Sequence, residues 1–67
     1  MSDREPAITE IEAAERLGLS VATLRQWRYR GRGPNFMRFG RAVRYLPSDL
    51  DEFVRRNTVT PLIDHRV

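Results

Sequence analysis

The sequence lacks the residues on which several classes of small protein depend. It has no cysteine, which excludes a disulfide framework and a thiolate metal site. Its single histidine, His65, has no second ligand for zinc and no partner for general-base catalysis. No apolar run approaches the roughly 20 residues that a membrane span needs, and no signal-peptide pattern opens the chain. We therefore expect a soluble, cytoplasmic protein with no catalytic site, metal or cofactor.

Lysine is also absent, so arginine supplies all 12 basic residues. The planar guanidinium suits phosphate and guanine, but codon bias in a GC-rich genome gives the same composition. We favour codon bias, because arginine replaces lysine outside the basic segment as well, at Arg4, Arg55, Arg56 and Arg66. The positions of the arginines are therefore more informative than their identity.

Acidic residues are missing from the segment between Arg16 and Pro47, which holds eight arginines. All nine acidic residues lie outside it, so the net charge of +3 combines +8 within the segment and −5 outside. Such sorting is typical of a protein that places one face on a polyanion, since cations near phosphates release condensed counterions. The segment predicts contact with nucleic acid.

The 67 residues suffice for one small domain, with a flexible N-terminus at residues 1–7 and a tail at 58–67. Thr9 and Glu12 have the capping-box spacing that begins a helix, and Gly18 suits its end. Ile11, Ala14 and Leu17 recur on one face of this helix, which we expect to face inward.

A second helix begins only two residues later, with Ser20 as its N-cap and with Leu24 and Trp27 as its apolar stripe. It ends at Gly31. Two helices joined by so short a turn must cross steeply, as in a helix-turn-helix.

Residues 36–46 are aromatic and β-branched on both sides of Gly40-Arg41, which predicts a β-hairpin with Gly40 at positive φ. A third helix follows, with Ser48 as N-cap and Asn57 and Thr58 at its end. The fold class is α+β, mostly α: a winged helix-turn-helix over residues 8–57. We expect the following side chains to lie in the core or beneath the wing: Phe36, Phe39, Val43, Tyr45, Leu50, Phe53 and Val54.

The second helix presents Ala22, Gln26 and Tyr29 opposite its apolar stripe. No acid interrupts this surface, which favours a groove-facing helix over an ordinary solvated face. Gln26 suits adenine, and an arginine suits guanine or phosphate. Arg28 falls nearer the buried side, where it covers the core or pairs with an acid of a neighbouring helix. The candidate DNA-binding residues of this helix are Ser20, Ala22, Thr23, Arg25, Gln26, Tyr29 and Arg30.

The hairpin offers a second contact through Arg38, Arg41 and Arg44. These arginines suit phosphates or a narrow minor groove, where the negative potential is enhanced. They could instead protect an edge strand against pairing with another chain. We favour DNA contact, most strongly for Arg41 at the turn.

Three strings in this order resemble the winged-helix excisionase family and the N-terminal DNA-binding domain of MerR-like regulators. The resemblance covers residues 8 to about 56. The strings are Leu19-Ser20-x-x-Thr23-Leu24-Arg25-x-Trp27 with Arg30-Gly31-x-Gly33-Pro34, then Gly40-Arg41-x-Val43-Arg44-Tyr45, and finally Ser48-Asp49-Leu50.

The resemblance implies residues 20–30 in the major groove of double-stranded DNA and residues 38–44 in the minor groove or on phosphates. It further implies repeated sites, DNA bending, cooperative self-association on DNA and an integrase partner, which an excisionase directs towards prophage excision without catalysis of its own. The chain ends about ten residues after the third helix, where MerR-like regulators continue, which favours an excisionase or a minimal phage-type regulator. The alternatives are a small transcriptional regulator of phage or mobile-element genes and an interaction module for an acidic protein.

Overall fold

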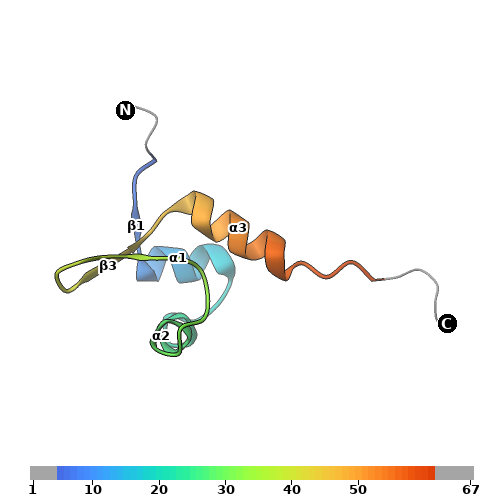
Figure 1. The fold of residues 1–67 in the computed structure, drawn as a ribbon, viewed down its shortest axis with the longest axis horizontal. Helices are drawn as coiled ribbons and strands as arrows, with labels where there is room; N and C mark the ends of the chain where they lie inside the picture. Colours follow the sequence, from blue (N-terminus) through green and yellow to red (C-terminus); the bar gives the residue numbers. More distant parts are fainter. Residues whose placement is uncertain (1–4, 62–67) are drawn as a thin grey trace.

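The structure, a computed structural model, describes residues 5–61 as three helices and a small antiparallel sheet. Figure 1 shows α1 at the centre, α2 nearly end-on beside it, and the β2–β3 hairpin extending to one side. The architecture confirms the predicted winged helix-turn-helix. The elements are β1 (Ile8–Thr9), α1 (Glu10–Leu17), α2 (Val21–Tyr29), β2 (Met37–Phe39), β3 (Ala42–Tyr45) and α3 (Pro47–Asn57).

Local hydrogen bonds define the turn between α1 and α2. The Thr9 hydroxyl accepts from the Glu12 N–H at 3.1 Å, and the Glu12 carboxylate accepts from the Thr9 N–H at 3.1 Å. At the other end of α1, Gly18 adopts a φ of 70°, which a residue with a Cβ rarely adopts. Ser20 then accepts from the Thr23 N–H at 3.1 Å and begins α2. The predicted capping box, glycine stop and serine cap are all confirmed.

The sheet has the order β1-β3-β2, so β3 is its central strand. Phe39 pairs with Ala42 across the two-residue turn, and Gly40 there has a φ of 63°, as predicted. Strand β1 was not predicted; its Ile8 pairs with Tyr45 of β3. Two residues are too few to show strand periodicity in a sequence, and only the pairing with β3 makes them a strand.

The core lies where α1, α2, α3 and β3 meet. Leu24 and Tyr45 are its largest fully buried side chains, and Ala13 and Ala14 are the buried residues of α1, which packs against α2, α3 and β3. Ile11 is 59% exposed, so its expected inward orientation was wrong; α1 buries Ala13 instead. Phe39 and Val54 are likewise exposed rather than buried. The buried hydrophobic residues are Ile8, Ala13, Ala14, Leu24, Val43, Tyr45 and Leu50.

Helix α3 begins differently from the prediction. Pro47 is its first residue and Leu46 its N-cap, so Ser48 lies inside the helix and does not cap it. Proline is favoured at this position because its fixed φ is helical and its missing N–H would be unsatisfied there. The Ser48 N–H donates instead to the Glu5 carboxylate at 3.0 Å, and the Ser48 hydroxyl donates to the same carboxylate.

The end of α3 agrees with the prediction, because Asn57 is its last residue and Thr58 its C-cap. Within residues 5–61, no helix is long and apolar enough to cross a membrane. His65 and the end of the predicted 58–67 tail lie outside the described residues.

Candidate nucleic-acid interface

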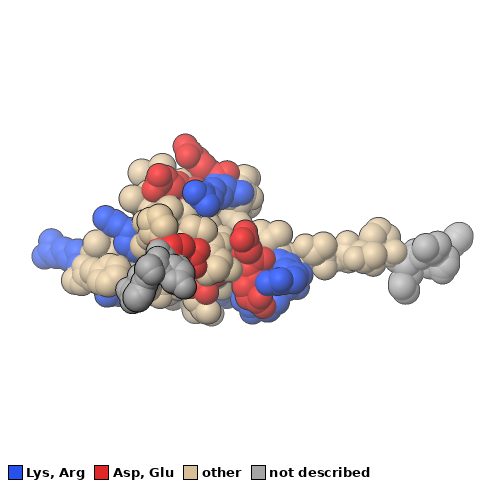
Figure 2. Space-filling view, turned by 90° about the horizontal axis from the view of Figure 1, so that it is seen from above, with Lys and Arg blue, Asp and Glu red and all other residues tan. Residues whose placement is uncertain are grey.

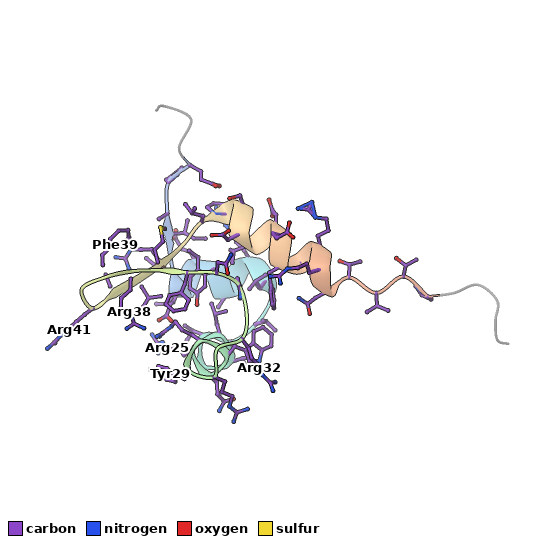
Figure 3. The ribbon with its side chains drawn as sticks, in the orientation of Figure 1. Arg25, Tyr29, Arg32, Arg38, Phe39 and Arg41 are labelled. Carbon is purple, nitrogen blue, oxygen red and sulfur yellow. The ribbon has the colours of Figure 1, made fainter. Side chains whose placement is uncertain are left out.

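A hollow of about 430 Å³ separates α2 from the hairpin, and arginines from both elements line it. In Figure 3, Arg25 and Tyr29 project from the side of α2 that faces the hairpin, and Arg38 projects from the hairpin towards α2. Arg41 extends beyond them at the tip. Five arginines that lie at most 19 positions apart in the sequence therefore border one concave surface: Arg25, Arg28, Arg38, Arg41 and Arg44.

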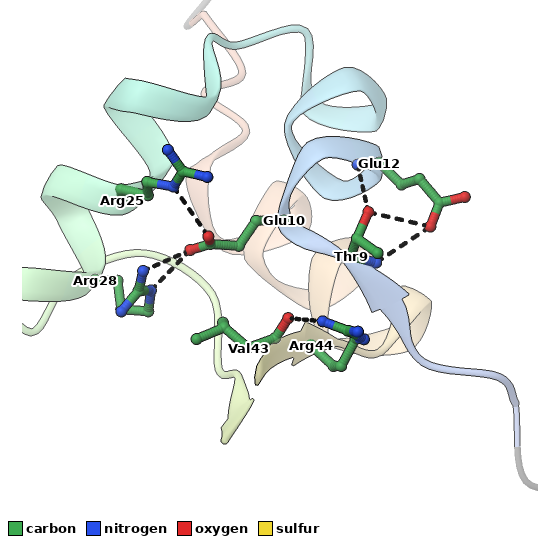
Figure 4. Close-up of polar contacts among 7 residues, drawn as sticks. All are labelled: Thr9, Glu10, Glu12, Arg25, Arg28, Val43 and Arg44. Atoms are coloured by element: carbon green, nitrogen blue, oxygen red, sulfur yellow. Dashed lines mark hydrogen bonds and ion pairs between the residues drawn. The ribbon is translucent and has the colours of Figure 1, made fainter. Parts of the chain in front are cut away.

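One acidic side chain enters this hollow. Glu10, the first residue of α1, accepts a hydrogen bond from Arg25 Nε at 3.0 Å through Oε1. Its Oε2 accepts from Arg28 Nε at 2.9 Å and lies 2.7 Å from Arg28 Nη2 (Figure 4). The acid-free segment of the sequence is therefore not acid-free in space, because Glu10 folds against two of its arginines.

The two arginines that share Glu10 differ in exposure. The Arg28 side chain is 8% exposed and the Arg25 side chain 47% exposed, while Glu10 is 12% exposed. Burial alone would lower the pKa of Arg28, but the hydrogen bond and charge of Glu10 outweigh it and raise that pKa. The interpretation of Arg28 as a residue that pairs with an acid of a neighbouring helix is thus confirmed.

The predicted groove-facing stripe of α2 lies on the surface. Ala22, Gln26 and Tyr29 are all exposed, Tyr29 to 74%, and Arg30 is exposed at the end of the helix. Ala22, Gln26 and Arg30 do not line the hollow; they extend the candidate surface along α2.

Ser20 and Thr23 have a different position from the rest of the predicted site. The Ser20 hydroxyl accepts from the Thr23 N–H and donates to the Thr23 hydroxyl at 3.0 Å. Both hydroxyls thus form hydrogen bonds at the start of α2, where they stabilise the first turn of the helix that carries the candidate base-contacting residues.

The turn of the wing extends away from α3 (Figure 1), and Arg41 lies at its tip (Figure 3). Arg38 and Arg41 are exposed, whereas Arg44 is half-buried and donates to the Val43 carbonyl at 2.8 Å. On the face shown in Figure 2, basic side chains occupy the hairpin end, and acidic side chains gather nearer the middle together with further basic side chains. The hairpin end of this face is therefore basic, whereas the middle carries charges of both signs.

Glu10 is the functional candidate that sequence reasoning missed. Its signal was available: Glu10, Ala14 and Leu17 lie at i, i+4 and i+7, so a carboxylate occupies the inward face of α1. A carboxylate on such a face needs a partner, and in the structure two arginines of α2 provide it. Its identity as the partner of both Arg25 and Arg28 depends on the crossing of α1 and α2.

The close helix pair, the α2 surface and the arginine-bearing hairpin define a winged helix-turn-helix protein. The chain matches the sequence model described as helix-turn-helix domain over residues 9–58, and it belongs to that family, which includes excisionase-like proteins. The family indicates DNA binding and is typically non-enzymatic. No curated protein and no solved structure gives a significant match.

Proposed function

We propose that the protein binds double-stranded DNA with α2 in the major groove and the β2–β3 wing on the adjacent minor groove or its phosphates. The observation that carries this proposal is the arginine-lined hollow between α2 and the hairpin. A concave basic surface between two projecting elements suits a phosphate backbone that passes between them. The exposed stripe of α2 would then face base edges.

Gln26 and Arg41 have different roles in this proposal. Gln26, exposed on α2, would pair with an adenine, so Gln26→Ala should relax the preference at one base pair by about 1–3 kcal/mol. Arg41, at the wing tip, would contact backbone and influence all sequences alike. Selection from a random duplex library measures both effects. A uniform loss of affinity in both variants would mean that Gln26 does not read a base.

We further propose that this DNA binding serves site-specific recombination, with the protein as an excisionase that directs an integrase towards prophage excision. Support comes from the excisionase-like strings between Leu19 and Leu50 and from the family, which includes excisionase-like proteins. Two DNA-contacting elements on one small domain suit repeated sites and bending, since contacts in adjacent grooves stabilise a deformed duplex. Cooperative self-association on DNA belongs to the same proposal.

The recombination role predicts that an integrase gene lies beside the protein's own gene, and that integrase provides the test. Purified protein should stimulate excision by that integrase from a plasmid carrying both attachment sites, and Arg41→Ala should reduce the stimulation. If the protein leaves excision unchanged yet alters expression from a promoter that it binds, the transcriptional alternative replaces the excisionase proposal. Neither outcome decides whether the protein binds DNA, which is tested separately.

A further inference from the structure

Glu10 places a carboxylate in a hollow that five arginines line. A carboxylate at a DNA-facing surface repels phosphate, so its presence needs a reason. One of its oxygens has a structural reason: Oε2 neutralises Arg28, which is buried and would be costly without a counter-charge. The other oxygen, Oε1, bonds Arg25, which is about half exposed and needs no such neutralisation.

The bond between Glu10 and Arg25 runs through Arg25 Nε. It fixes the plane of the guanidinium and leaves both Nη atoms available; within residues 5–61 they have no hydrogen-bond partner. Figure 4 shows these two nitrogens directed away from Glu10. A guanidinium held in this way presents two parallel donors, which match the O6 and N7 acceptors of guanine.

We propose that Glu10 is a positioning residue that orients Arg25 for bidentate recognition of a guanine in the major groove. This inference rests on the proposed DNA binding by α2. An untethered arginine samples many rotamers and readily binds phosphates, which carry no sequence information. The Glu10 carboxylate holds Arg25 in one orientation and repels phosphate beside it. It therefore lowers the affinity of Arg25 for the DNA backbone and increases its discrimination between bases.

The test is selection from a random-sequence duplex library, followed by sequencing, with four proteins of confirmed fold. They are the wild type, Glu10→Gln, Arg25→Ala and the control Glu15→Gln. Glu15 is an exposed residue of the same helix and does not line the hollow, so the control removes an equal charge elsewhere.

A bidentate arginine discriminates its guanine by about 5- to 150-fold. We expect one G·C pair in the selected site to lose at least fivefold of its preference in Arg25→Ala and in Glu10→Gln, while Glu15→Gln retains it. In Glu10→Gln, the affinity for unselected duplex should stay equal or rise, because a negative charge has left the interface. A merely structural Glu10 would lower all affinities together.

The double variant Glu10→Gln/Arg25→Ala should lose no more preference than Arg25→Ala alone, because Glu10 acts through Arg25. Losses at different base pairs, or a wild-type preference in folded Glu10→Gln, would overturn the proposal. If Glu10→Gln does not fold, Glu10→Gln/Arg28→Met takes its place, since it also removes the buried cation. If the wild type selects a DNA sequence and Arg25→Ala selects the same sequence, only this inference is refuted. If the wild type binds no DNA, the proposed function is refuted.

Discussion

Arg28 and Arg25 form a matched pair for a stability prediction, because both bond the same Glu10 carboxylate from positions three residues apart. They differ in exposure, at 8% for Arg28 and 47% for Arg25. Removing one partner of a buried ion pair costs about 3–5 kcal/mol. Since Arg25 remains to compensate Glu10 partly, we expect Arg28→Ala to cost about 3 kcal/mol, at the lower end of that range.

Arg25→Ala should cost at most about 1 kcal/mol, the usual limit for an exposed ion pair. Urea unfolding measures both changes through the fluorescence of Trp27, the only tryptophan, whose ring centroid lies 5.6 Å from that of Phe53. With a urea dependence of about 1 kcal/mol/M for so small a domain, the midpoint should fall by about 3 M and by less than about 1 M respectively.

The result that would refute this reasoning is an equal loss in the two variants. It would mean that burial of Arg28 contributes nothing beyond an exposed pair. A larger loss of unfolding free energy for Arg25→Ala would show that Arg25, and not Arg28, is the arginine that stabilises the fold. Arg25 could then no longer be treated as a residue available for DNA contact.

Three further predictions concern the wing, the loop after α2 and the core. Arg41→Ala should weaken binding to all duplexes alike and make the log–log salt slope less steep by about 0.9, as titrations at several salt concentrations measure. Gly33→Ala should lower the unfolding free energy in urea by about 2 kcal/mol, because the φ of Gly33 is 88° and an added Cβ would lie 3.3 Å from Trp27 Cβ. Gly31→Ala should lower it by about 1 kcal/mol, because Gly31 also has a positive φ but an added Cβ there would meet open space. Burial, and after it the charge of Glu10, raises the pKa of Tyr45. The stabilisation by the neutral Tyr45 side chain is therefore complete below about pH 10 and is lost at higher pH, where the hydroxyl ionises more readily in the unfolded chain. Tyr45→Phe should consequently lose less stability above about pH 10 than the wild type does.

The parts of the fold that the sequence predicted are those fixed by local chemistry. The Thr9 capping box, the Gly18 stop and the Gly40 turn depend on residues within a few positions of one another. The parts that escaped prediction depend on distant partners. Strand β1 exists only through its pairing with β3, and Ser48 interacts with Glu5 rather than capping its own helix.

The candidate site divides in the same way. The arginines of α2 and the wing were identifiable from the absence of neighbouring acids, and the structure brings five of them to one hollow. The missed acid, Glu10, lies 15 positions from Arg25 and 18 from Arg28. Sequence distance concealed a contact that the crossing of α1 and α2 creates, and with it the different roles of the two arginines.

The most direct test of the central claim is the salt dependence of binding between the intact protein and duplex DNA. About five phosphate contacts from α2 and the wing predict a slope near −4.5 in a plot of log association constant against log salt concentration. Fluorescence anisotropy of a labelled duplex at several salt concentrations gives this slope. A slope close to zero, or no binding at low salt, would contradict the account, because the arginine-lined hollow would then not bind a DNA backbone.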